Sequence, residues 1–281
     1  MPGNASPGLK PGNAARCHWR TAAPVRSDLA LLYLHGFSAS PGEAGALPER
    51  MADALDANGY VHRWPGHGQH AADALAGLTP AAMQASALQA LGQAQRMGER
   101  VAIVGSSLGG TLALWLAAQC PAQVAAVVAW SPGIRPVNAG LLDRLCEAQA
   151  PVTDPYPRNE AVQAFWSDTL HPDGFRTLRG LLDLFAASPP WPQVRCPVML
   201  GYYRAPNGDE DPISSVPAML SMFDALGTPP ARKQAIAFAS GAHAIGSPHK
   251  SPMAEQVAHA SVQFLRTQLC TDAAGTANHR N

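Results

Sequence analysis

The sequence predicts an α/β protein with one mostly parallel central sheet, helices on both faces and a small helical lid insertion. Short apolar runs rich in β-branched residues alternate along the chain with segments of helical period. This alternation is the order expected when helices connect parallel strands and cover both faces of their sheet. The length of 281 residues and the hydrophobic content of 47 % suffice for one large core, so a single domain is expected.

Apolar runs indicate the expected strands, and proline or helix-capping residues indicate where most of the expected helices begin. Strands are predicted at 29–35, 60–64, 101–105, 124–130, 198–203 and 234–239, with room for one or two edge strands at 17–25. Helices are predicted to begin near Pro48, near Pro80 behind the capping residue Thr79, after Ser107, near Ser214 and Ser215, and at Met253, the last ending at Leu269.

Residues 136–190 interrupt this alternation, because their pattern is helical and loopy without a convincing strand. Their many apolar side chains, among them Leu145, Phe175 and Leu182, exceed the needs of a plain connector. Either they form a lid over a site, or they pack the insertion onto the edge of the sheet. The domain is expected to span 16–270, between flexible tails at 1–15 and 271–281.

The composition excludes several classes of function. Basic and acidic residues balance at 20 each with no basic stripe, so nucleic acid is not expected as a partner. No apolar stretch approaches the roughly 20 residues of a membrane helix, and the N-terminus has no signal-peptide core, so a soluble, unexported protein is expected. The five cysteines are widely spaced without a Cys-x-x-Cys pair, which favours a reducing cytoplasm over a disulfide framework.

The strand at 101–105 runs directly into Gly105-x-Ser107-x-Gly109 and then into a helical pattern. This is the nucleophile elbow of a serine hydrolase, in which a sharp turn between strand and helix exposes the serine hydroxyl. Glycines two residues before and after the serine are needed because side chains would collide in so tight a turn. Ser107 is therefore the predicted nucleophile.

A nucleophilic serine needs a base and an orienting carboxylate, which on the fold that carries this elbow follow it in the order acid, then histidine. His243 is the predicted base, because it follows the strand at 234–239 on a loop where sites of parallel sheets form. His249 and His259 are weaker alternatives, in a loop and in the last helix. The acid is expected in the turn after 198–203, with Asp211 favoured and Asp209 second.

Two backbone N–H groups are expected to form the oxyanion hole. One belongs to Leu108, the residue after the nucleophile, and the other to Phe37, behind the sharp turn at His35 and Gly36. His35 is expected to brace this loop, and Glu43 is either a turn brace or a pocket residue, with the brace favoured.

No cofactor or metal is expected. His67 and His70 lie three apart on a glycine loop without nearby cysteine or carboxylate, which is weak evidence for zinc. Neither a Gly-x-Gly-x-x-Gly motif after the first strand nor a phosphate-binding Gly-Lys-Ser/Thr loop occurs.

Taken together, these motifs resemble the α/β-hydrolase superfamily over nearly the whole chain, from about Cys17 to Leu269. The resemblance is carried by Leu32-Tyr-Leu-His-Gly-Phe37, Arg63-Trp-Pro-Gly-His-Gly68, Gly105-Ser-Ser-Leu-Gly-Gly110 and Ala242-His243. The acid loop departs from the family pattern, since Asp211-Pro-Ile-Ser matches only the second half of Gly-x-x-Asp-x-x-Val. The most similar branch is that of carboxylesterases and lysophospholipase or monoacylglycerol-lipase relatives, which carry a helical lid where 136–190 lies.

The resemblance implies hydrolysis of a small-molecule carboxylic ester through an acyl-enzyme. Ser107 would attack, His243 would transfer the proton, Asp211 would orient His243, and the N–H groups of Phe37 and Leu108 would hold the oxyanion. The apolar insertion favours an acyl or aromatic ester. Acyl transfer on the same scaffold and a non-catalytic ligand-binding protein are the alternatives.

Overall fold

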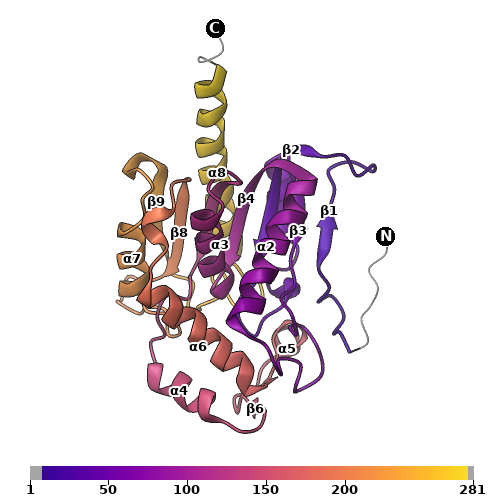
Figure 1. Cartoon of the computed structure of the whole chain (residues 1–281), viewed down its shortest axis with the longest axis vertical. Helices are drawn as coiled ribbons and strands as arrows, with labels where there is room; N and C mark the ends of the chain where they lie inside the picture. The colour runs from indigo at the N-terminus through magenta and orange to yellow at the C-terminus, as the bar shows by residue number, and fades with distance from the viewer. Residues whose placement is uncertain (1–7, 278–281) are drawn as a thin grey trace.

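A computed structural model describes residues 8–277 and shows a seven-stranded sheet in the order β1-β3-β2-β4-β5-β8-β9 (Figure 1). All neighbouring strands are parallel except β1, which runs antiparallel to β3 at one edge. The α/β class predicted from the sequence is therefore confirmed. The strands are β1 (Arg16–His18), β2 (Ser27–Leu34), β3 (Asn58–Val61), β4 (Gly98–Ser106), β5 (Val124–Trp130), β8 (Val198–Tyr203) and β9 (Lys233–Phe238).

Alternate residues of the central strands supply the two apolar faces of the sheet. Leu32 of β2 and Ile103 of β4 face α2 (Pro80–Met97), α3 (Leu108–Gln119) and α7 (Val216–Asp224). Leu31 and Val104 face α1 (Leu47–Ala54) and α8 (Ala254–Ala277) on the opposite side. Because both faces are covered, these strands consist almost entirely of apolar residues.

The observed strands differ from the predicted ones mainly at β1 and β3. Strand β3 pairs with β2 from Asn58 and ends at Val61, whereas 60–64 was predicted. The chain has left the ladder by Trp64, whose backbone and indole N–H groups donate to His35 at 3.2 and 2.8 Å. At the edge, only Arg16–His18 pairs as β1, which overlaps the start of the region 17–25 where one or two strands had room.

The insertion between β5 and β8 contains α4 (Ala139–Glu147), α5 (Glu160–Phe165) and α6 (Pro172–Ala187). It also contains a two-stranded ladder that the sequence did not predict, β6 (Val152–Thr153) paired with β7 (Thr169–Leu170). Strands of two residues leave no period to detect in a sequence. These elements gather at one end of the sheet, and α8 projects from the other (Figure 1).

The segment 8–15, expected to belong to a flexible tail, packs against the body and is called the N-terminal strap below. Its backbone pairs with the loop at 66–70, through Lys10 N–H to Gly68 O at 2.9 Å and His70 N–H to Gly8 O at 2.8 Å. Asn13 is fully buried and donates to Ala164 O of α5 at 2.9 Å. The strap thus joins the loop between β3 and α2 to the insertion.

At the other end of the chain, α8 continues to Ala277, into the segment 271–281 expected as a tail. Residues 1–7 and 278–281 lie outside the described residues. Among the helices of residues 8–277, none combines the length and the apolar character required to span a bilayer.

Candidate active site

Ser107 lies on the turn between β4 and α3 in a backbone conformation that residues other than glycine rarely adopt. Its φ and ψ are 51° and −120°, and its N–H donates to Trp130 O at 2.8 Å. A Cβ at Gly105 would lie 2.4 Å from Gly109 O, and one at Gly109 would lie 2.0 Å from Leu34 O. Both positions therefore require glycine, and the strain of the turn presents the Ser107 hydroxyl at the carboxyl end of the sheet.

The side chain of His243 contacts Ser107 across this end of the sheet. His243 lies on the loop that follows β9, and its Nε2 is 2.8 Å from Ser107 Oγ. The loop is braced by Ser240, whose hydroxyl donates to Ala242 O at 2.9 Å. The imidazole side chain is only 16 % exposed, so its contact with the serine is largely shielded from water.

Asp211 completes the chain of contacts on the far side of the imidazole. Its Oδ2 lies 2.7 Å from His243 Nδ1, while Oδ1 accepts the N–H groups of Ile213 and Ser214 at 2.9 and 3.0 Å. Burial would raise the pKa of this carboxyl, but the bond and charge of His243 and the two N–H donors outweigh burial and lower it. An ionised Asp211 fixes the proton on Nδ1 and leaves Nε2 free to accept from Ser107.

The neighbouring carboxylates of the acid turn point elsewhere. Asp209 is exposed and bonds Asn207 within the loop, and Glu210 pairs with Arg204. Of the two acids left open by the sequence, the structure brings Asp211 to His243. The alternative histidines likewise bond other partners. His249 contacts Gly42 O at 3.2 Å, and His259 contacts Gln263.

Two backbone N–H groups beside Ser107 have no acceptor within residues 8–277. They belong to Phe37, behind the turn at Gly36, and Leu108, the first residue of α3. Most backbone N–H groups of folded proteins are paired. These two donors remain available to a bound oxygen, and two such donors are what an oxyanion hole requires.

His35 and Glu43 brace the loop that carries Phe37. The His35 ring is fully buried, with Nδ1 donating to Gly36 O at 2.9 Å and Nε2 accepting from Trp64 N–H. Burial, chiefly, holds the pKa of His35 well below its usual value, so the ring is neutral and acts as a brace. Glu43 Oε1 accepts Gly36 N–H at 2.8 Å and the Tyr33 hydroxyl at 2.9 Å. Its signal in the sequence was the spacing Ser-Pro-Gly-Glu.

The glycine loop at 66–70 contributes a buried ring to the same region. His67 is 1 % exposed, donates from Nδ1 to Pro65 O at 2.9 Å and packs 6.0 Å from the Phe37 ring. Burial lowers the pKa of His67 to about 4. His70 pairs through its backbone with Gly8 of the strap. The two histidines therefore support the loop through different contacts.

The insertion covers the oxyanion loop with apolar side chains. The Phe175 ring of α6 packs edge-on against Phe37, with centroids 5.7 Å apart, in a cluster with Leu142 and Leu182. Leu181 and Phe185 of the same helix join the main core, so α6 packs against both the body and the oxyanion loop.

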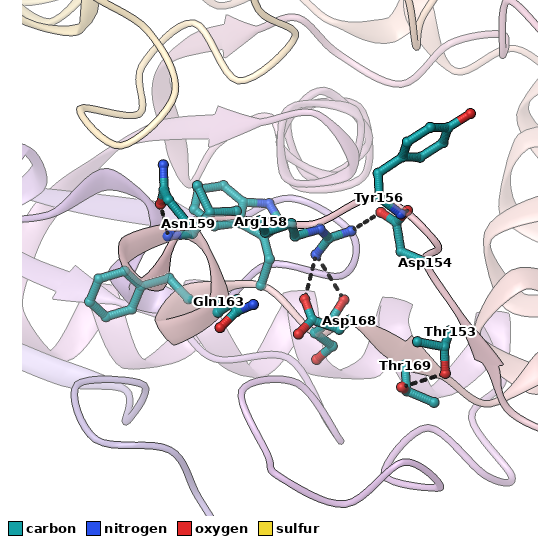
Figure 2. Close-up of polar contacts among 12 residues, drawn as sticks. Thr153, Asp154, Tyr156, Arg158, Asn159, Gln163, Asp168 and Thr169 are labelled. Atoms are coloured by element: carbon teal, nitrogen blue, oxygen red, sulfur yellow. Dashed lines mark hydrogen bonds and ion pairs between the residues drawn. The ribbon is translucent and has the colours of Figure 1, made fainter.

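Arg158 joins the segments of the insertion that precede and follow α5, as Figure 2 shows. Its guanidinium pairs with Asp154 at 2.6 Å and Asp168 at 3.4 Å, next to the β6–β7 ladder. Asn159 caps α5 by accepting Val162 N–H at 2.9 Å. At the end of α5, Ser40 Oγ donates to Phe165 O at 3.0 Å, which attaches this helix to the oxyanion loop.

A family model described as "Alpha/beta hydrolase family" matches residues 31–260, the greater part of the chain. The chain belongs to the alpha/beta hydrolase family. The match includes the strand of the oxyanion loop, the elbow, the acid turn and the His243 loop. A search of curated protein sequences found no match.

Solved structures of lipases and esterases share the fold of this hydrolase at low sequence identity. One, from work on the metagenome-derived lipolytic enzymes LipS and LipT, has a TM-score of 0.77 at 20 % identity and covers 92 % of this chain and 99 % of its own. A monoacylglycerol lipase of Paleococcus ferrophilus has a TM-score of 0.68 at 18 % identity, covering 91 % and 98 %. A monoglyceride lipase of Saccharomyces cerevisiae has a TM-score of 0.63 at 14 % identity, covering 90 % of both chains.

Proposed function

We propose that this protein is a serine hydrolase that cleaves carboxylic esters through an acyl-enzyme on Ser107. The observation that carries the proposal is the continuous chain of contacts from Ser107 Oγ to His243 and from His243 to Asp211, at 2.8 and 2.7 Å. A nucleophile, a base and an orienting carboxylate in this geometry are the parts that acyl transfer to a serine requires.

In the first half of the reaction, Ser107 Oγ attacks the acyl carbon while its proton moves to His243 Nε2. Asp211 stabilises the imidazolium that forms, and the N–H groups of Phe37 and Leu108 bind the oxyanion. When the tetrahedral intermediate collapses, the carbon–oxygen bond to the alcohol breaks and Nε2 returns the proton to the leaving alkoxide. Water then repeats the sequence on the acyl-enzyme, releasing the acid and restoring Ser107.

The substrate class we infer is an acyl or aromatic ester. The apolar cluster of Phe37, Phe175, Leu142 and Leu182 supports this inference, because the ring of an oxyanion-loop residue is part of it. The structural neighbours named above, which are lipolytic enzymes and glyceride lipases, point in the same direction. A panel of p-nitrophenyl esters of rising chain length tests it, and turnover of the acetate alone would contradict an apolar acyl site.

Labelling with a fluorescent fluorophosphonate tests the serine mechanism directly. We expect the wild type to gain one adduct by intact mass and Ser107→Ala to gain none. Absence of label from both would contradict the proposal and favour a non-catalytic ligand-binding protein. If the wild type is labelled, product partition in the presence of an added alcohol distinguishes hydrolysis from acyl transfer.

A further inference from the structure

Glu43 lies in the short 3-10 turn η1 (Pro41–Ala44), between the oxyanion loop and α1, and is 2 % exposed. A carboxyl group this deeply buried is costly unless it is held by hydrogen bonds. One oxygen, Oε1, accepts both Gly36 N–H at 2.8 Å and the Tyr33 hydroxyl at 2.9 Å. Glu43 therefore ties the loop that precedes Phe37 to strand β2.

The other oxygen lies on the side of Gly36 where the nucleophile also lies. A Cβ built on Gly36 would lie 3.5 Å from Glu43 Oε2 and 3.3 Å from Ser107 Cβ, so the carboxyl group and the serine are both immediate neighbours of Gly36. Within residues 8–277, Oε2 accepts no hydrogen bond. The Tyr33 hydroxyl also interacts with Ser106, the residue before the nucleophile, so the same network reaches the elbow.

Ionisable groups from several elements surround this carboxyl group. Tyr33 reaches it from β2, and His243 and Lys250 act on it from the loops between β9 and α8. His249 lies against Gly42 O, one residue away, and Arg16 acts on Tyr33 from β1. Burial raises the pKa of Glu43 to about 7, against the lowering effects of Gly36 N–H, Tyr33, Lys250 and His243.

We propose that Glu43 is a positioning residue of the candidate active site, which holds the His35–Gly36 peptide, directly before the Gly36–Phe37 peptide, in place through its bond to Gly36 N–H. The Phe37 N–H is the next donor along this loop, so its direction depends on how Gly36 is held. Errors of a fraction of an ångström in an oxyanion donor reduce the rate of acyl transfer. The inference rests on the serine hydrolase proposed above, and it adds a side chain that acts through the backbone of the oxyanion hole.

Three variants separate this role from a general structural one. Glu43→Ala removes the acceptor for Gly36 N–H and for Tyr33, whereas Glu43→Gln retains an acceptor oxygen and loses only the charge. Tyr33→Phe removes the hydroxyl, with its bond to Glu43 and its interaction with Ser106, and keeps the buried ring. Asp53→Ala, on α1 and paired with His18, is the control because it loses a carboxylate outside the network.

The experiment measures the maximal rate and the half-saturation concentration of fluorophosphonate labelling, which needs no knowledge of the natural substrate. For Glu43→Ala we expect the maximal rate to fall about 10- to 100-fold with little change in half-saturation. Glu43→Gln should restore the rate to within about threefold of wild type, Tyr33→Phe should lose a few-fold, and Asp53→Ala should match the wild type. Circular dichroism establishes that each variant is folded.

The possible failures are distinguishable. A wild type that is not labelled contradicts the proposed serine hydrolase itself. A labelled wild type together with an equally fast Glu43→Ala overturns the role of Glu43 alone. Equal losses in Glu43→Ala and Glu43→Gln also overturn it, because positioning through an acceptor oxygen predicts rescue. If Glu43→Ala does not fold, an unchanged rate in Tyr33→Phe and a large loss in Glu43→Gln refute the network.

Discussion

Glu43 also makes the stability of the fold depend on pH, and Glu43→Gln measures the size of this effect. Burial raises the pKa of Glu43 from 4.5 to about 7 in the folded protein. Below pH 4.5 the carboxyl group is protonated in both the folded and the unfolded chain. As the pH rises toward 7, the unfolded chain releases this proton while the folded protein still holds it, so unfolding becomes progressively easier. Above pH 7 both states are ionised and the loss is complete.

The magnitude follows from the two pKa values. At about 1.4 kcal/mol per unit, a shift of this size removes about 3 kcal/mol of unfolding free energy between acidic and alkaline pH. Glutamine cannot ionise but keeps an oxygen for Gly36 N–H and Tyr33, so Glu43→Gln escapes this loss. We expect the variant to gain about 1 kcal/mol over wild type at pH 5 and about 3 kcal/mol at pH 8.

Equilibrium urea unfolding followed by circular dichroism at both pH values measures the difference. Glu99→Gln removes one exposed carboxylate and reports the effect of net charge alone. A difference between Glu43→Gln and wild type that stays constant from pH 5 to pH 8 would refute the reasoning, since it would mean that Glu43 titrates alike in both states. A difference that shrinks with rising pH would also refute the reasoning, because the predicted pH dependence has the opposite direction.

Three further predictions concern the acid, the strap and the insertion. Asp211→Asn should lower kcat on a p-nitrophenyl ester about 10³- to 10⁴-fold because the imidazole loses its orienting anion. Asp209→Asn should stay within about threefold of wild type. A large loss in Asp209→Asn with none in Asp211→Asn would exchange the roles of the two acids. Asn13→Ala should lower the unfolding free energy by about 1–3 kcal/mol in thermal or urea unfolding, because it removes a buried amide that donates to Ala164 O, and it should speed proteolysis within the insertion. Asn207→Ala on the exposed acid turn serves as the control. Phe175→Ala should raise KM about tenfold for longer acyl esters and leave that for acetate unchanged if the ring contributes to the acyl site, and an equal rise for both esters would contradict this role.

Local signals predicted most of the sheet and the core of the candidate site. The elbow was readable because its glycines and serine form a short fixed pattern between a strand and a helix, although a side chain at Gly109 is excluded by the distant Leu34 O. Strands β5 and β8 were readable as continuous apolar runs. The choice between Asp211 and Asp209 stayed open because it depends on which way one turn presents its side chains. Both are acids in the same turn, and only the folded turn shows that Asp211 accepts from Ile213 and Ser214 with one oxygen and contacts His243 with the other.

The features that the sequence did not reveal depend on distant contacts. The N-terminal strap is rich in Pro, Gly and Asn, a composition typical of coil, and its order comes from partners such as Ala164, about 150 residues away. Glu43 was left between a brace and a pocket residue, because only the folded loop brings Gly36, Tyr33 and Ser107 around its carboxyl group.

The hydrogen bonds from the strap to α5 and the residue after it all go to main-chain oxygens. Lys10 Nζ donates to Gln163 O and Trp166 O at 2.8 and 3.0 Å, and Asn13 donates to Ala164 O. Carbonyl oxygens are present whatever residue occupies a position. Apart from Phe165, whose ring lies beside Gly12 of the strap, the side chains of α5 can therefore be exchanged during evolution without loss of these bonds. Selection can then reshape this wall of the insertion while Lys10 and Asn13 keep it in place.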